Sequence, residues 1–296
     1  FRIESAKAQY QAALAASYQT GYRLAMIWAG AGALWLAARA ETTTGIYLAE
    51  AWQFAYLCMA LSISVGVVTT LLSPEPQAVL LPKARSTGQW LQQTLIEPFA
   101  DFISRYRWQA FLILGLIAIY RISDVVMGIM ANPFYVDMGY TKDEVAAVTK
   151  VFGVIMTLVG AFLGGLLTMR FGVMRVLLLG GILSAASNLL FAWLSTRGHD
   201  LNGLVWVISA DNLSSGIASA AFIAYLSSLT NVQYSATQYA LFSSMMLLLP
   251  KWLAGFSGVY VDTFGYEHFF IATALIGIPV LILIMLAIRI EKTNSS

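Results

Sequence analysis

Hydrophobic and polar positions in this chain alternate on the scale of whole helices. Eight apolar stretches, each near the roughly 20 residues that cross a bilayer as an α-helix, are separated by short polar segments. They run approximately over residues 14–38, 47–72, 108–130, 146–169, 173–194, 204–229, 239–261 and 269–290. We therefore expect an all-α, polytopic membrane protein with about eight transmembrane helices.

The longest polar segment covers residues 73–107 and includes Pro74, Pro76 and Pro82. We interpret it as a cytoplasmic linker, with a surface helix near residues 90–106. Six spans after such a linker resemble one half of a transporter of the major facilitator superfamily, in which two six-helix bundles enclose a central site. The resemblance implies that residues 1–72 hold the last two helices of an incomplete first bundle. Residues 108–296 would form the complete second bundle, and the chain would not transport by itself.

Composition and charge agree with a membrane protein and disfavour other classes. Only 11% of residues are charged and the mean hydropathy is +0.73, whereas a soluble domain is about 25% charged. The net charge of +2 gives no basic patch for nucleic acid. With one cysteine and two separated histidines, both expected in loops, we predict no metal site and no cofactor.

The loop charges predict the orientation. Ten Lys and Arg residues fall in one set of alternate loops and ends, and three fall in the other. Because cytoplasmic loops carry the excess of basic residues, we expect both termini and the linker in the cytoplasm.

Charges inside the apolar stretches are the candidate functional residues, because a charge in hydrocarbon costs about 2.5–3.5 kcal/mol on insertion scales. Arg121 and Asp124 lie three residues apart, on one face of a helix, and can partly neutralise each other. Asp124 is our first candidate for proton coupling, and the alternative is a static ion pair with Arg121. Asp211 is the second candidate, with hydrogen bonding between helices as its alternative.

Substrate contacts are expected from basic, aromatic and amide side chains near these charges. Arg23 lies in the first predicted span, which belongs to the incomplete first bundle, and its guanidinium suits a carboxylate of the solute. The alternative is an ion pair with an acid of another helix. Lys251 lies inside a span, where it could contact substrate or an acid such as Asp211. The remaining candidates are aromatic or amide residues that also suit interfaces and helix packing: Tyr22, Tyr120, Asn212 and Gln238.

The loop at residues 164–175 contains Gly164, Gly165, Arg170, Gly172 and Arg175. It resembles the glycine- and arginine-containing loop motif of the superfamily, although Met169 stands where the motif usually has Asp. The small residues Gly153, Gly160, Gly164 and Gly165 predict close contact between neighbouring helices.

Four stretches together carry a narrower resemblance. They are residues 18–26 (YQTGYRLAM), residues 119–153 with IYRISD, NPFY and VTKVFG, residues 211–241 with DNLSSG and ATQYAL, and residues 258–266 (GVYVDTFGY). The chain resembles the AmpG-type muropeptide permeases over nearly its whole length. This resemblance implies proton-driven import of anhydro-muropeptides, which are sugar-peptides of the cell wall, by a monomer in the bacterial inner membrane.

Alternatives remain open on the sequence. The same branch is similar to acetyl-CoA transporters, so another bulky anionic solute is possible. An intramembrane enzyme would need a nucleophile or a metal at membrane depth, and no Gly-x-Ser-x-Gly or His-Glu-x-x-His pattern occurs. A non-transporting scaffold is disfavoured because charges occur in several spans.

Overall fold

The computed structural model describes residues 10–40, 49–74 and 86–295, and every regular element among them is a helix. Side chains are not described at residues 12, 31, 34, 142–143, 150–151 and 291–295. The chain forms two compact units, Tyr18–Gln77 and Arg2–Ser17 with Ala78–Ser296. The N-terminal end of the predicted first bundle and the linker prolines at 76 and 82 lie outside the described residues.

Unit 1 contains the two helical stretches that precede the linker, except for the first residues of α2 up to Ser17. Helix α2 (Gln11–Ile27) continues through the π-helical turn η2 (Trp28–Gly32) into α3 (Ala33–Ala40), and α4 (Ala49–Leu72) follows. Trp28 Nε1 donates a hydrogen bond to Ser62 Oγ at 2.9 Å and joins the two stretches. Helix α4 is apolar on every side and buries only Ala51 and Ala55, as expected for a helix surrounded by lipid or by other helices.

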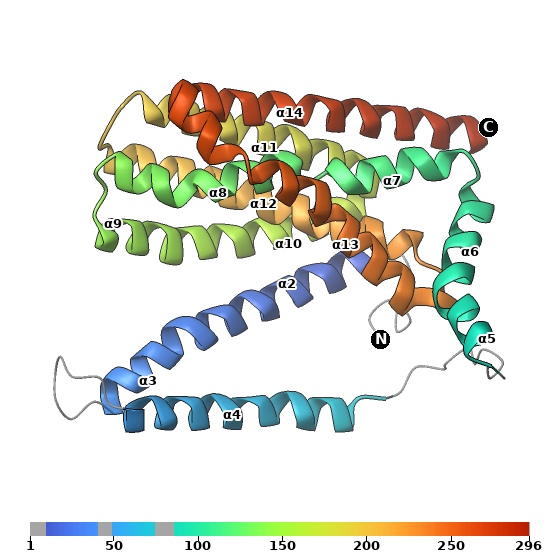
Figure 1. Ribbon diagram of the computed structural model, residues 1–296, viewed down its shortest axis with the longest axis horizontal. Helices are drawn as coiled ribbons and strands as arrows, with labels where there is room; N and C mark the ends of the chain where they lie inside the picture. The colour runs from blue at the N-terminus through green and yellow to red at the C-terminus, as the bar shows by residue number, and fades with distance from the viewer. Residues whose placement is uncertain (1–9, 41–48, 75–85, 296) are drawn as a thin grey trace. The chain divides into compact units, whose positions relative to one another are not determined.

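Unit 2 begins with the helices of the predicted linker, α5 (Thr87–Leu91), η3 (Gln92–Ile96) and α6 (Glu97–Tyr106). The chain then runs back and forth between two ends of the unit (Figure 1). The first pass consists of α7 (Gln109–Ile119) and α8 (Ile122–Asp137), and the second of α9 (Lys142–Ala147), η4 (Val148–Gly153) and α10 (Val154–Phe171). Helices α11 (Val173–Ser195) and α12 (Leu201–Leu229) each form one pass. The last elements are η5 (Val232–Tyr234), α13 (Ser235–Ala254) and α14 (Ser257–Ser295).

Helix α14 contains a sharp turn at Gly265, where φ is +79°. A positive φ is readily adopted by glycine because it has no Cβ. The segment before Gly265 therefore completes the pass begun by α13, and the segment after it runs back. His268, which the sequence suggested would lie in a loop, lies inside α14 because the turn needs only this one residue.

Six helical stretches in the described residues are long and apolar enough to cross a membrane: Ala49–Leu72, Gln109–Asp137, Val154–Phe171, Val173–Ser195, Leu201–Leu229 and Ser257–Ile290. The chain is thus an all-helical polytopic membrane protein, as predicted. The other two predicted spans, residues 14–38 and 239–261, are also largely helical. The first is interrupted at η2 and the second passes from α13 into α14, so the total of eight spans stays a prediction.

Helices α10 and α12 pack closely through glycine. A Cβ on Gly160 would lie 2.3 Å from the carbonyl oxygen of Leu213, and a Cβ on Gly216 would lie 2.4 Å from that of Thr157. No side chain fits at such distances, so the backbones approach directly. The close helix contact that Gly160 predicts is confirmed for α10 and α12.

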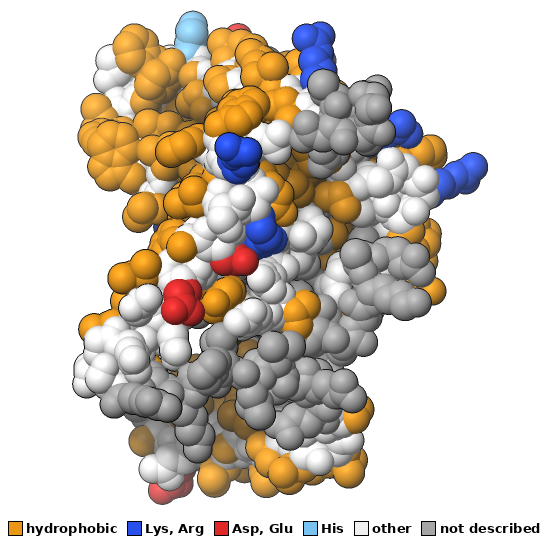
Figure 2. Space-filling view, turned by 90° about the vertical axis from the view of Figure 1, so that its right-hand side faces the viewer, with side chains coloured by type: hydrophobic (Ala, Val, Ile, Leu, Met, Phe, Trp, Pro, Cys, Tyr) orange, Lys and Arg blue, Asp and Glu red, His pale blue; other side chains and the backbone are white. Residues whose placement is uncertain are grey.

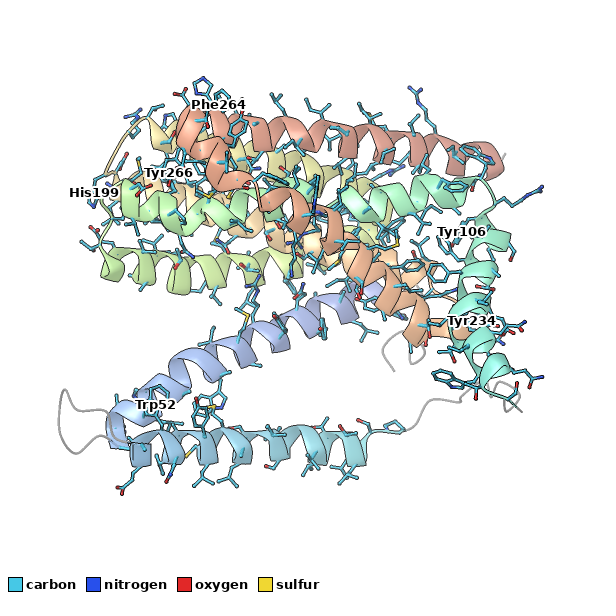
Figure 3. The ribbon with its side chains drawn as sticks, in the orientation of Figure 1. Trp52, Tyr106, His199, Tyr234, Phe264 and Tyr266 are labelled. Atoms are coloured by element: carbon cyan, nitrogen blue, oxygen red, sulfur yellow. The ribbon has the colours of Figure 1, made fainter. Side chains whose placement is uncertain are left out.

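The two ends of unit 2 differ in their side chains. Tyr106 and Tyr234 lie at one end and His199 at the other (Figure 3). The end with Tyr106 also holds four arginines, and we call it the arginine-rich end: Arg105, Arg107, Arg170 and Arg175. Figure 2 looks onto this end and shows Lys and Arg side chains as separate patches among hydrophobic ones.

Candidate functional site

The pass from Gln109 to Asp137 is broken in its interior. Helix α7 ends at Ile119, and Arg121 has φ −92° and ψ 7° before α8 begins at Ile122. The sequence predicted one continuous helix over 108–130, so the break is a difference from expectation. Breaks within membrane helices expose helix ends to polar groups, and transporters place solute sites at such points.

Arg121 and Asp124 form an ion pair at this break, as their spacing predicted. Arg121 Nη2 contacts Asp124 Oδ2, and the side chains are only 23% and 19% exposed. Asp124 lies in the first turn of α8, where the positive end of the helix dipole favours a carboxylate. Arg121 Nη1 also donates to Ser219 Oγ on α12 at 2.6 Å, so the guanidinium links the break to a second helix.

Asp211 on α12 belongs to the same group of charges. Ser187 Oγ on α11 donates to Asp211 Oδ1 at 3.0 Å, and the charged side chains that act on Asp211 are Asp124 and Arg121. The structure therefore brings together both acids that the sequence singled out. The group holds two carboxylates and one guanidinium, of which Arg121 and Asp124 are in contact, so it has a net negative charge when both acids are ionised.

A second polar chain crosses the unit next to this group. Asn188 Nδ2 on α11 donates to Ser123 Oγ on α8 at 2.8 Å, and Ser123 Oγ donates to the carbonyl oxygen of Thr273 on α14 at 2.7 Å. All three residues are buried, and Asn188 Oδ1 has no partner among the described residues. These residues carry no charge and are not among the candidates that the sequence indicated. The adjacent Ser187 and Asn188 inside an apolar stretch were the available signal.

Tyr120 and Asn212 are engaged in contacts between helices. The Tyr120 ring stacks on Phe222 at 4.5 Å between centroids, and its hydroxyl donates to the carbonyl oxygen of Leu177 at 3.2 Å. Asn212 accepts from Thr157 Oγ1 at 2.9 Å and donates to the carbonyl oxygen of Ile208. Their polar atoms are thus already used within the unit.

Gln238 and Lys251, both on α13, lie in different surroundings. Gln238 is 1% exposed, and at the arginine-rich end it bonds the linker helix α6 through Pro98 and Asp101. Lys251 is exposed and pairs with no acid in the described part of the chain, so the predicted Asp211 pairing is not observed.

Tyr22 and Arg23 belong to α2 in unit 1. Tyr22 is 52% exposed and stacks on Tyr18 with ring centroids 6.5 Å apart. Arg23 is half-buried, and its Nε has no hydrogen-bond partner among the described residues. The guanidinium therefore keeps donor capacity for another group.

Comparison with known proteins places this arrangement in context. The model of the Major Facilitator Superfamily matches residues 112–296. "Putative transporter AmpG 4" of Rickettsia conorii is 32% identical over 285 residues, which cover 96% of this chain and 66% of the relative. "Anhydromuropeptide permease" of Escherichia coli K12 is 34% identical over 280 residues, covering 94% of this chain and 54% of the relative. The chain thus spans between about half and two thirds of the length of these relatives.

Proposed function

We propose that this chain, which belongs to the Major Facilitator Superfamily, carries anhydro-muropeptides from the periplasm to the cytoplasm with entry of protons. The observation that carries the proposal is the half-buried group of Arg121, Asp124 and Asp211 at a broken helix. Its relatives are named as transporters or as an anhydromuropeptide permease, and the family consists of transporters rather than enzymes.

The imbalance of two carboxylates and one guanidinium supports proton coupling. While Asp124 is ionised, it holds Arg121 in the ion pair. A proton on Asp124 removes that attraction, and Arg121 then becomes available to Asp211 or to a carboxylate of the solute. Binding of the anionic solute and binding of the proton thereby favour each other, which is the coupling that a symporter requires.

The remaining candidates divide by what they already contact. We assign solute contacts to Arg23, Tyr22 and Lys251, because their polar groups are not consumed by ion pairs in the described residues. A guanidinium fork matches the peptide carboxylates of a muropeptide. Tyr120, Asn212 and Gln238 would instead position helices α7, α12 and α13.

The membrane arrangement is part of the proposal. Relatives from bacteria with two membranes and the long apolar helices support a multi-pass protein of the inner membrane. The basic residues support a cytoplasmic location for the arginine-rich end and both termini. We expect the transporter to act as a monomer.

Uptake measurements test this function directly. Labelled anhydro-muropeptide would be offered to cells that lack their own importer and that express this chain. In parallel, cells would express the chain completed with the part of the Escherichia coli relative that it does not match. We expect uptake by the completed chain that an uncoupler abolishes and that Asp124→Asn lowers by at least about tenfold, with a smaller loss for Asp211→Asn.

Asp262→Asn is the matched control, because Asp262 is exposed on α14. It should leave uptake unchanged. Uptake that persists with an uncoupler would refute proton coupling. If the cells take up no muropeptide but accumulate acetyl-CoA, the protein is still a transporter and its substrate is acetyl-CoA.

A further inference from the structure

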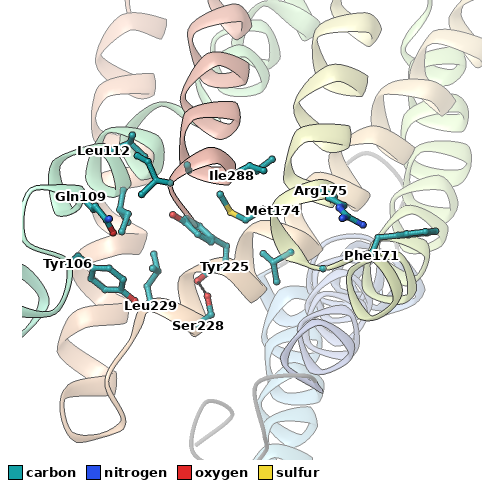
Figure 4. Close-up of a pocket in the computed structure, with 15 residues that line it drawn as sticks. Tyr106, Gln109, Leu112, Phe171, Met174, Arg175, Tyr225, Ser228, Leu229 and Ile288 are labelled. Carbon is teal, nitrogen blue, oxygen red and sulfur yellow. Dashed lines mark hydrogen bonds between the residues drawn. The ribbon is translucent and has the colours of Figure 1, made fainter. Parts of the chain in front are cut away.

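A pocket of about 740 Å³ opens at the arginine-rich end of unit 2, away from the charged group described above. It lies among the start of α7, the start of α11, the end of α12 and the end of α14. Figure 4 shows Gln109 and Leu112 on one side and Phe171 and Arg175 on the other, with Tyr225 and Ser228 between them. This volume lies in the range of small-ligand pockets, about 300–1,000 Å³.

The walls of the pocket are largely apolar. Leu112, Ile113, Met174, Leu229 and Ile288 line it. A sugar-peptide needs hydrogen-bond partners along its length, and these side chains offer none. The interior suits a hydrocarbon chain instead.

The mouth of the pocket carries hydrogen-bond donors and positive charge. Arg175 and Gln109 both line it, and neither has an ion pair or side-chain hydrogen bond among the described residues. Arg107 and Trp108 line an adjoining hollow that shares Tyr106 and Gln109 with the pocket. None of the described residues that line either hollow is acidic. Exposed Trp and Tyr favour the level of lipid headgroups, so the mouth lies where a phosphate would lie.

We propose that this pocket binds one anionic phospholipid, with an acyl chain between Leu112 and Ile288 and the phosphate at Arg175. Charge complementarity supports this assignment. An arginine fork binds phosphate through paired N–H groups. Basic pockets between membrane helices on the cytoplasmic side attract anionic headgroups. The binding is independent of which solute is transported.

Native mass spectrometry of the purified full chain tests the proposal without any transport assay. The chain would be released from nanodiscs that contain equal amounts of phosphatidylglycerol and phosphatidylcholine, and the retained lipid would be counted. We expect one phosphatidylglycerol to be retained in preference to phosphatidylcholine. Arg175→Gln should weaken its retention about fivefold, the effect of one basic residue near an anionic headgroup.

Two further variants make the result specific. Arg197→Gln removes a cation that lies over Trp193 at the opposite end, and it should retain lipid as the unmodified chain does. Leu112→Trp fills the apolar wall and should displace the lipid, provided that helical content by circular dichroism is unchanged. Equal retention of the two lipids, or full retention of phosphatidylglycerol by Arg175→Gln, would overturn the proposal.

Discussion

Arg121 contacts Asp124 three residues further along the chain and Ser219 ninety-eight residues further along, so one guanidinium joins the break between α7 and α8 to α12. The two contacts have different consequences. The ion pair neutralises a charge inside the unit, whereas the bond to Ser219 holds the break against a neighbouring helix. Conditions that weaken the Arg121–Asp124 ion pair therefore leave the hydrogen bond from Arg121 to Ser219 in place.

Removal of Arg121 alone should be more harmful to stability than removal of Arg121 and Asp124 together. Arg121→Gln leaves the half-buried Asp124 without its partner, which costs about 3 kcal/mol. The double variant with Asp124→Asn removes both members of the pair and should be closer to the original chain. Thermal unfolding in detergent, monitored by circular dichroism, measures this cycle.

Transport should respond differently from stability in the same cycle. If the pair serves coupling, the double variant recovers stability and still fails to transport. A double variant that transports normally would show that the ion pair is only structural.

The sequence predicts the helices of this protein well, because a membrane helix must be long and apolar throughout. It also predicts the Arg121–Asp124 pair, because residues three apart lie on one helical face. The break in the helix at Arg121 was not predictable from local apolarity, which is continuous on both sides. Its stabilising partner, Ser219, is distant in sequence.

The candidate residues that the sequence indicated lie in different parts of the structure. Asp124 and Asp211 come together, but Lys251 does not join them in the structure. Gln238, which the sequence indicated as a candidate sugar-binding amide, donates hydrogen bonds to Pro98 and Asp101 of α6 in the structure. Its partners on α6 lie more than 130 residues away, and no spacing rule reaches that far.

Substitution of Gly160 should disrupt the packing of α10 on α12. Gly160→Ala places a Cβ 2.3 Å from the Leu213 carbonyl oxygen, so the helices must separate. Overpacking of this kind costs about 1–3 kcal/mol. We expect a lower thermal unfolding temperature, measured by loss of the monomer peak after heating and size-exclusion chromatography.

Gly128→Ala is the matched control for that experiment. Gly128 lies in α8, and a Cβ there would meet no atom within 4 Å. Alanine favours the helix by up to about 1 kcal/mol over glycine, so this variant should be as stable as the original chain or more stable. Equal unfolding temperatures for the two variants would contradict the close packing at Gly160.

Gln238→Ala should release the linker helix α6 from α13. The Gln238 amide donates to the Pro98 carbonyl oxygen at 2.8 Å and to Asp101 Oδ2 at 2.9 Å, and its oxygen accepts from the Asn231 amide at 2.7 Å. Loss of these bonds leaves buried groups unpaired, at about 1–3 kcal/mol each. Faster hydrogen exchange over residues 97–106 would report the release.

The neighbouring Gln233→Ala provides the control, because the Gln233 side chain is exposed. It should leave exchange in α6 unchanged. If Gln238→Ala also leaves exchange unchanged, the contacts between α6 and α13 do not hold the linker helix.

Glu144 should make the end opposite the arginine-rich end sensitive to acid. The Thr141 backbone N–H donates to its carboxylate, the His199 ring lies 3.1 Å away and the Thr141 hydroxyl also donates. Together these contacts lower the pKa of Glu144 from 4.5 to about 2. A pKa that is lower in the folded state stabilises the fold above the unfolded pKa, and this stabilisation is lost as pH falls through the folded pKa.

The window of sensitivity therefore lies between pH 4.5 and about pH 2. At neutral pH, Glu144→Gln should unfold at a lower temperature than the original chain, because an amide oxygen is a weaker acceptor than a carboxylate. The difference should shrink as the pH is lowered through this window, because Glu144 then becomes protonated. Glu267→Gln, at an exposed position of α14, should show no such pH-dependent difference. A difference for Glu144→Gln that stays constant from neutral pH down to pH 2 would mean that the charge of Glu144 does not stabilise the α11–α12 loop.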